Sequence, residues 1–237
     1  TATLSLTAFA MQWADYQYEL IDPSFGPCDD DSVDTIPGIC GQPYQVGVFN
    51  AGDAHINGVN AEFDWNPTDN ISLGMNMEWL EAETDTVLEL GDLYVDSGTR
   101  LPLTPEYTGG IWATYNWTVP SLNANAYARL QWSYSGERLS SLQMTPRMYE
   151  DGSTHPNPSW TIPAYDIGDF SVGMQGDVWE ISLFLNNITD ERAIYSQASQ
   201  GGYTQQNVDE GRMHVQTLYT NRPREYGIRF IRKFGGG

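Results

Sequence analysis

Basic residues, cysteines and long apolar runs are all scarce in this 237-residue chain. The longest apolar runs fall far short of the roughly 18 residues that a membrane-spanning helix requires. Lysine and arginine together number 11 against 31 acidic residues, which gives a formal net charge of −20. A surface that binds phosphates is basic, so this charge argues against a nucleic-acid partner.

The only two cysteines are Cys28 and Cys40, and both lie in one loop rich in aspartate, glycine and proline. We predict a disulfide between them, which fits an oxidising compartment, with two free thiols as the alternative. The acidic run between them, Asp29 to Asp34, has the oxygen ligands that Ca²⁺ prefers. It lacks the spacing of an EF-hand loop, so a hydrated acidic loop is the simpler interpretation.

Patterns of catalytic and metal-binding residues are also lacking. His55, His155 and His214 are scattered, with no pair at metal-ligand spacing. Ser140 and Ser141 have no histidine or aspartate in a recognisable arrangement with them. We therefore predict no catalytic, cofactor-binding or metal-binding residue, no cofactor and no enzymatic activity.

What the chain does have is alternation of apolar and polar residues, seen most clearly over residues 123–134. Side chains alternate between the two faces of a strand, so this segment presents one apolar and one polar face. The apolar members are Ala124, Ala126, Ala128, Leu130, Trp132 and Tyr134, and the polar members are Asn123, Asn125, Arg129, Gln131 and Ser133.

Eight such strands can be predicted, joined alternately by long polar loops and short turns. They cover residues 3–19, 44–65, 71–84, 104–117, 123–134, 163–174, 179–186 and 223–234. This pattern is typical of an all-β, antiparallel transmembrane β-barrel, in which short turns lie at one end and long loops at the other. A soluble β-sandwich is the alternative, since its strands alternate as well.

The two faces of these strands give two sets of candidate residues. Trp65, Trp117 and Trp179 lie beside the three short turns, as expected for an aromatic girdle at a membrane–water interface. We expect the apolar set to face lipid, including Leu130, Leu183 and Phe230. We expect the polar set to face the lumen: Asn60, Glu62, Asp64, Asn76, Glu78, Arg129, Gln131, Glu180 and Arg229.

Four segments resemble, in order and spacing, the C-terminal part of the barrel of TonB-dependent outer-membrane receptors. They are a strand and turn at 57–70, the loop-to-strand entry at 101–107, the segment Phe184-Leu-Asn-Asn-Ile-Thr-Asp-Glu-Arg192 and the closing strand at 223–230. The resemblance covers nearly all of the chain. It implies that residues 1–234 supply the last eight strands of a barrel of about 22 strands, with 235–237 as a glycine tail.

The resemblance also implies a function and partners. Such a receptor lies in the bacterial outer membrane and imports a scarce nutrient such as a ferric siderophore, a cobalamin or a glycan. Its partners are membrane lipids and lipopolysaccharide, a plug domain and the remaining strands, a periplasmic TonB-type energy-coupling protein and the nutrient. In that family the polar set contacts the plug.

The closing strand carries the family's assembly signal, which the resemblance assigns to Tyr226, Ile228, Phe230 and Phe234. Arg232 departs from the pattern, because the family usually has an aromatic or aliphatic residue there. Gly235-Gly-Gly237 follows Phe234, where the family's chain ends.

Because Thr1 opens directly into a predicted strand, we expect the chain to be a mature fragment or the later part of a longer polypeptide. Two alternatives belong to other classes of protein. The first is a free-standing eight-stranded barrel with a structural or adhesive role. The second is a barrel enzyme such as a lipase or protease, which the lack of a nucleophile–base arrangement disfavours.

Overall fold

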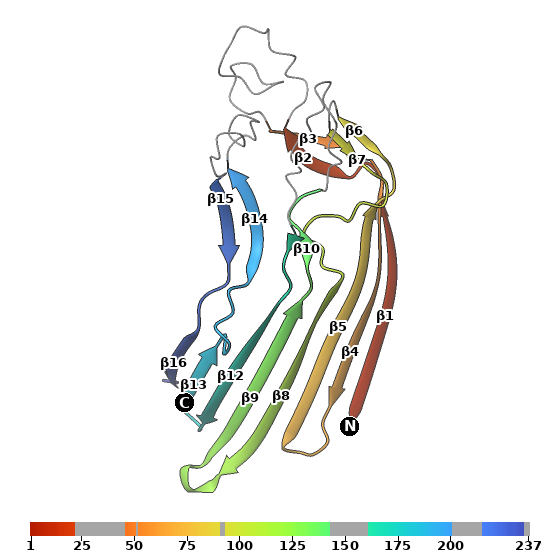
Figure 1. Ribbon diagram of the computed structural model, residues 1–237. Coiled ribbons are helices and arrows are strands. Elements are labelled where there is room, and N and C mark those ends of the chain that lie inside the picture. The colour runs from red at the N-terminus through yellow and green to blue at the C-terminus, as the bar shows by residue number, and fades with distance from the viewer. Residues whose placement is uncertain (22–45, 51, 91–92, 143–160, 201–214, 235–237) are drawn as a thin grey trace.

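In the computed structural model, one curved antiparallel sheet forms most of the chain (Figure 1). The structure describes residues 1–21, 46–50, 52–90, 93–142, 161–200 and 215–234. Eight strands form the sheet in chain order: β1 (Ala2–Trp13), β4 (Ala54–Trp65), β5 (Ile71–Thr84), β8 (Tyr107–Val119), β9 (Ala124–Ser135), β12 (Tyr165–Gln175), β13 (Trp179–Asn186) and β16 (Glu225–Arg232).

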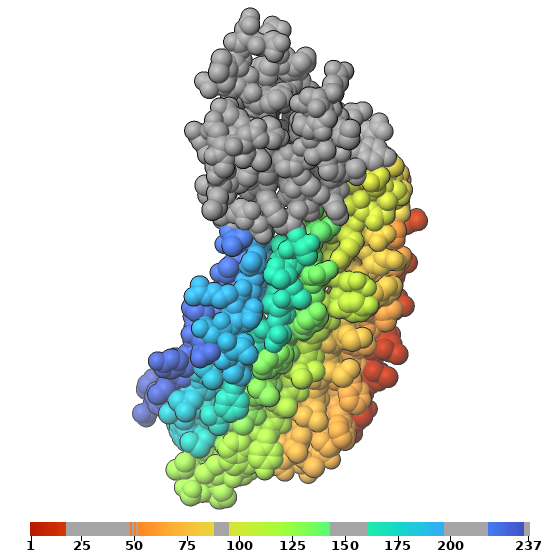
Figure 2. Space-filling model, in the orientation of Figure 1, coloured from red at the N-terminus to blue at the C-terminus, as the bar shows by residue number. Residues whose placement is uncertain are grey.

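The sheet is open. Its edges are β1 and β16, which pair with β4 and β13 but not with each other. The eight strands therefore do not close into the free-standing barrel that the sequence left open as an alternative. The space-filling view shows the strands as one continuous surface that runs from orange through green to blue (Figure 2).

Short connections lie at the lower end of the sheet in Figure 1 and long ones at its upper end. The turn between β4 and β5 is built by Thr68, whose Oγ1 accepts hydrogen bonds from the backbone N–H groups of Asn70 and Ile71. The turn between β8 and β9 is a 3₁₀ helix, η1 (Pro120–Leu122), which ends at Asn123 in the left-handed conformation with φ of 46°. Asparagine tolerates this conformation better than most residues, so the turn chemistry explains the tight connections.

Each long connection contains a two-stranded ribbon; the sequence prediction had assigned three of these ribbons to loop, and the β2–β3 ribbon mainly to the ends of two longer strands. These are β2 (Gln17–Ile21) with β3 (Val46–Asn50), β6 (Leu88–Leu90) with β7 (Leu93–Val95), β10 (Arg138–Leu139) with β11 (Thr161–Ile162), and β14 (Ile194–Gln200) with β15 (Val215–Thr220). The first predicted strand, 3–19, is accordingly divided into β1 and β2, and the second, 44–65, into β3 and β4.

Among the described residues, no helix has the length and apolar character needed to cross a membrane.

A small hydrophobic core lies at the long-loop end of the sheet. Ile56 of β4 and Ala82 of β5 contact Leu101 and Leu142, which come from two different long connections. Leu142 is fully buried and Leu101 is 3% exposed. Burial of this kind stabilises the bases of the connections, since each buried aliphatic side chain contributes about 1.5–3 kcal/mol.

Candidate functional site

One face of the sheet is apolar along a row that crosses the sheet from edge to edge, with one residue from each strand. Strand pairing aligns one row across all eight strands: Ala2, Trp65, Leu73, Ala113, Leu130, Phe170, Leu185 and Tyr226. We call this side the apolar face. Leu4 is 63% exposed and Ile228 is 70% exposed on it, because no second sheet layer covers it among the described residues. An apolar surface this continuous calls for a covering layer.

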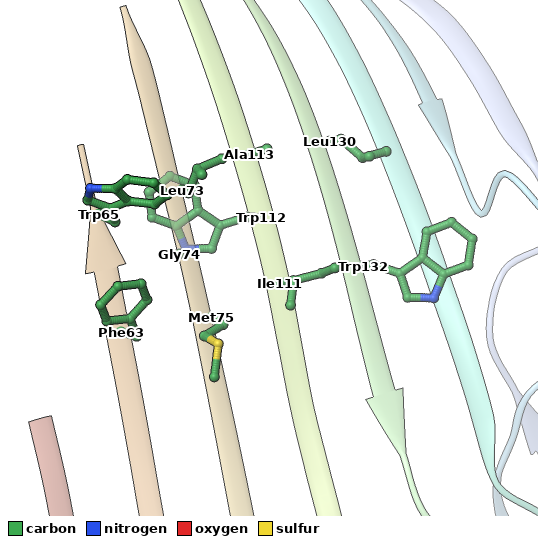
Figure 3. A pocket seen from close by; sticks show the side chains of 10 residues that line it. All are labelled: Phe63, Trp65, Leu73, Gly74, Met75, Ile111, Trp112, Ala113, Leu130 and Trp132. Atoms are coloured by element: carbon green, nitrogen blue, oxygen red, sulfur yellow. The ribbon is translucent and has the colours of Figure 1, made fainter. Parts of the chain in front are cut away.

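The apolar face is slightly hollowed near the short-turn end, across β4, β5, β8 and β9 (Figure 3). The hollow has a volume of about 360 Å³ and is lined almost wholly by carbon atoms. Its principal lining side chains are Phe63, Trp65, Met75, Ile111, Leu130 and Trp132. A site for a polar ligand would contain convergent polar groups, so this hollow belongs to the apolar surface.

The residues predicted to form the girdle and to face lipid lie on the apolar face. Trp65, Trp117 and Trp179 occupy apolar-face positions next to the three short turns. Trp117 stacks on Tyr115 of the same strand, with ring centroids 5.5 Å apart. Leu183 and Phe230 lie on the same face, opposite Ile228 and Ile181 respectively.

All nine residues of the predicted polar set lie on the other face, which we call the polar face. Asn60 pairs with Glu78, Glu62 with Asn76, and Asp64 follows in the same phase on β4. On β9, Arg129 Nη2 donates to Gln131 Oε1 at 3.4 Å. Glu180 lies opposite Ile231, and Arg229 opposite Ser182.

Aromatic side chains also lie on the polar face, each over a glycine of the neighbouring strand. The cross-strand pairs are Phe9 with Gly58, Trp112 with Gly74, Tyr127 with Gly173, and Phe184 with Gly227. A Cβ atom added at Gly74 would lie 2.4 Å from the Trp112 ring, so the ring occupies the space that any other residue would fill. The Arg129 guanidinium lies 5.3 Å from the centroid of this ring.

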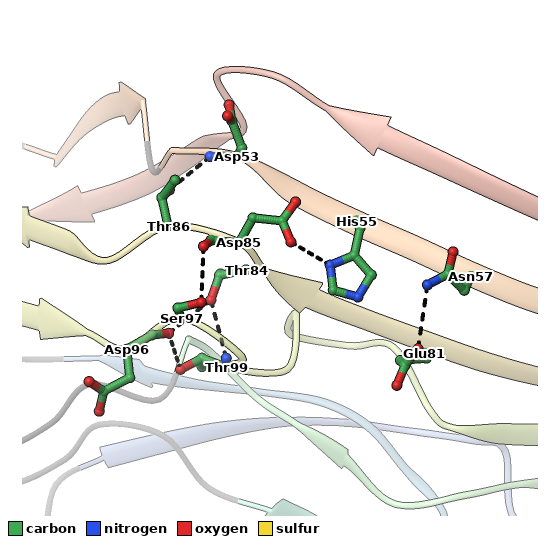
Figure 4. Close-up of polar contacts among 10 residues, drawn as sticks. All are labelled: Asp53, His55, Asn57, Glu81, Thr84, Asp85, Thr86, Asp96, Ser97 and Thr99. Atoms are coloured by element: carbon green, nitrogen blue, oxygen red, sulfur yellow. Dashed lines mark hydrogen bonds and ion pairs between the residues drawn. The ribbon is translucent and has the colours of Figure 1, made fainter.

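Near the long loops, the strand positions that continue the apolar face carry polar side chains (Figure 4). His55 Nδ1 lies 2.6 Å from Asp85 Oδ1, and Asn57 Nδ2 donates to Glu81 Oε2 at 3.4 Å. His55 therefore pairs with a single carboxylate. Among the described residues, no group of three or more His, Cys, Asp or Glu is arranged to hold a metal ion.

Hydrogen bonds also fix the base of the connection between β5 and β8. Thr84 is 2% exposed. Its Oγ1 donates to the Asp96 carbonyl at 2.9 Å and accepts from the Thr99 N–H at 3.2 Å. Ser97 Oγ donates to the Asp85 carbonyl at 2.9 Å. These hydrogen bonds attach the base of this connection to the end of β5.

Asn187 directly follows the last residue of β13 and joins three segments of the chain. It is 4% exposed and has φ of 53°. Its Nδ2 donates to the carbonyls of Glu191 (2.9 Å) and Arg222 (3.1 Å), and its Oδ1 accepts from the Glu191 N–H at 2.9 Å. Its own N–H donates to Asp169 Oδ1 on β12 at 2.9 Å. The segment 184–192, which the sequence singled out as a motif, is therefore a structural junction.

Arg138 forms a second junction at the base of the long connections. It is 5% exposed, and its Nη2 donates to the carbonyls of Ile194 and Tyr195, each at 2.9 Å. The guanidinium lies 5.4 Å from the centroid of the Tyr165 ring. Partial burial is the main reason why the pKa of the Tyr195 phenol is raised, and Tyr165 adds to this effect.

Several candidates from the sequence lie outside the described residues. They are the predicted disulfide of Cys28 and Cys40, the acidic run 29–34, and the histidines His155 and His214.

The comparison with family models bears on this architecture. The model described as TonB dependent receptor-like, beta-barrel, matches residues 1–188. The chain belongs to the TonB-dependent receptor β-barrel family. A search of curated proteins finds no match.

Solved structures of TonB-dependent receptors share this fold. The ferric yersiniabactin uptake receptor FyuA from Yersinia pestis is similar over 99% of the chain and 28% of its own length, with 19% identity and a TM-score of 0.61. The siderophore receptor PirA from Acinetobacter baumannii has 17% identity and a TM-score of 0.58 over 98% of the chain and 30% of its own length. The pyoverdine outer membrane receptor FpvA from Pseudomonas aeruginosa has 13% identity and a TM-score of 0.54, over 98% and 27%.

The TonB-dependent barrel piece described here spans less than a third of the length of these receptors. Its sheet is open at both edges, β1 and β16. The soluble β-sandwich alternative is wrong, since the family to which the chain belongs is one of β-barrels.

Proposed function

We propose that this chain is the last eight strands of an outer-membrane TonB-dependent receptor that imports a scarce nutrient. The observation that carries the proposal is the apolar row that crosses all eight strands, with a polar face behind it and two edge strands that are each paired on one side only. Lipid satisfies an apolar face, and further strands of the same barrel satisfy the edges.

The proposal assigns the two faces. The apolar face contacts lipid and lipopolysaccharide, with Trp65, Trp117 and Trp179 at the boundary with the periplasm. The nine residues of the polar set line the lumen and contact a plug domain. A TonB-type protein in the periplasm supplies the energy.

The nutrient that we favour is a ferric siderophore. The support is that the similar solved structures are receptors for ferric yersiniabactin, for pyoverdine and for a siderophore in the case of PirA. A cobalamin or a glycan remains the finer alternative that the test distinguishes.

The full-length protein provides the test. It should be produced in a bacterium that lacks its own siderophore receptors, and uptake of radiolabelled iron should be measured with several ferric siderophores. We expect uptake with at least one of them, and uptake should stop when the proton gradient is dissipated. The proposal fails if the protein is absent from the outer-membrane fraction. The substrate assignment fails if labelled cobalamin or glycan enters and no iron chelate does.

A further inference from the structure

Arg232 is out of place on the apolar face. Three basic side chains lie in the eight strands of the sheet, and Arg129 and Arg229 both belong to the polar face. Arg232 instead continues the row of Tyr226, Ile228 and Phe230, directly opposite Trp179 of β13. β16 therefore carries a permanent positive charge at the end of a series of apolar-face residues.

Within the part of the chain that the structure describes, a ring contact is recorded for the guanidinium of Arg232. Among the described residues, no carboxylate lies within ion-pair distance of it, and its nearest recorded partner is the Phe234 ring, with a centroid 5.4 Å away. The side chain is exposed. The backbone around it is fixed, because the Lys233 N–H donates to the Val178 carbonyl at 2.9 Å.

The level of Arg232 in the sheet selects the chemistry of its ligand. It lies at the short-turn end beside Trp179, and indole rings favour the boundary between acyl chains and headgroups. An arginine at that boundary donates hydrogen bonds to phosphate oxygens in a planar, bidentate arrangement. At the opposite end the same register carries acidic side chains, Glu81, Glu83 and Asp166, which repel an anionic headgroup.

We propose that Arg232, with Trp179 beside it, binds the phosphate of an anionic phospholipid in the membrane leaflet at the short-turn end. The inference rests on the proposed function, since it requires the apolar face to contact lipid. It also explains why this position departs from the aromatic or aliphatic residue usual in the family.

The test uses the full-length receptor in detergent micelles that contain phosphatidylglycerol, and native mass spectrometry to count the lipid retained on the folded protein. R232Q should retain about fivefold less phosphatidylglycerol than the wild type, the effect of one basic residue near an anionic surface. R229Q is the matched control, because it removes the same charge from the polar face three residues away. It should retain the wild-type amount.

Several outcomes decide the matter. Equal retention by R232Q and the wild type, or equal loss in both variants, overturns the proposal. Displacement of the lipid by inorganic phosphate at the same concentration also overturns it, since the site would then bind anions in general. If R232Q does not fold, R232L, which continues the apolar row, replaces it with the same expectation. Failure of the wild type to insert into vesicles would instead refute the proposed function.

Discussion

At the scale of the residue, two adjacent positions on β9 allow the assignment of the two faces to be tested. Leu130 lies in the apolar row and Gln131 on the polar face. Leu130→Arg should destabilise the full-length barrel by about 2–4 kcal/mol in lipid, because a charge on a lipid-facing position must leave water. Gln131→Arg should cost far less. Chemical unfolding of the protein in vesicles measures both, and equal losses would contradict the assignment of the faces.

The pair of Trp112 and Gly74 gives a second prediction. A Cβ at Gly74 meets the ring at 2.4 Å, so Gly74→Ala forces the tryptophan from its place. We expect a loss of about 1–3 kcal/mol in the free energy of unfolding. The double variant G74A/W112A should lose less than the sum of the two single variants, because the removed ring no longer collides with the methyl group. Additive losses would show that the two residues do not interact.

Asn187 gives a third prediction, with two causes that can be separated. Asn187→Ala removes the three side-chain hydrogen bonds and keeps a strained positive φ, so we expect a loss of about 2–4 kcal/mol. Asn187→Gly relieves the backbone strain and should recover part of it. Asn186→Ala, at the exposed preceding position, is the control. Thermal unfolding measures the stability of the three variants. Equal stabilities would contradict the role of Asn187 as a junction.

At the scale of the element, Arg138 connects the β10–β11 ribbon to the start of β14. Arg138→Leu keeps the bulk of the side chain but leaves the Ile194 and Tyr195 carbonyls without their donor. We expect faster hydrogen exchange over residues 194–200, while exchange in the eight sheet strands stays unchanged. Exchange measured by mass spectrometry checks this, and unchanged rates in β14 would mean that the contact does not hold the ribbon.

Strands were predictable from the sequence where one face was consistently apolar. The prediction for 71–84 has the same bounds as β5, because its alternation is regular. In β12 the alternation looks irregular in the sequence, because the apolar residues Ile167 and Phe170 are three positions apart and therefore lie on opposite faces. Gly168 occupies the apolar position there, opposite Trp132, whose ring lies over it, so the pairing stays regular.

Other features could not be predicted, because they depend on partners distant in the sequence. The sequences of β14 and β15 mix polar and apolar residues without a regular alternation, so no periodic pattern reveals this ribbon. Arg138 donates to carbonyls 56 and 57 residues away, and Asn187 donates to one that is 35 residues away, and no local pattern identifies such acceptors. Trp112 interrupts the polar residues of its strand, and only the register explains it, by placing Gly74 opposite.

At the scale of the whole molecule, the two edges of the sheet determine how the chain behaves by itself. β1 and β16 each present a row of backbone groups without partners in the sheet, and such edges associate with other chains. Residues 1–234 produced alone should therefore form oligomers or aggregates in detergent, whereas the full-length protein should be monomeric. Light scattering measures the mass. A monomeric, folded product would mean that β1 and β16 can close on each other.

The distribution of the glycine–aromatic pairs has a consequence for variation in this barrel. These contacts join β1 to β4, β5 to β8, β9 to β12 and β13 to β16, which are the strand pairs whose connection is long. Pairs joined by a tight turn inherit their alignment from that turn, but a long segment transmits no alignment. Side chains within the wall supply it instead. The long segments can consequently change in length and sequence, and so meet new ligands, without any shift of the strands that carry them.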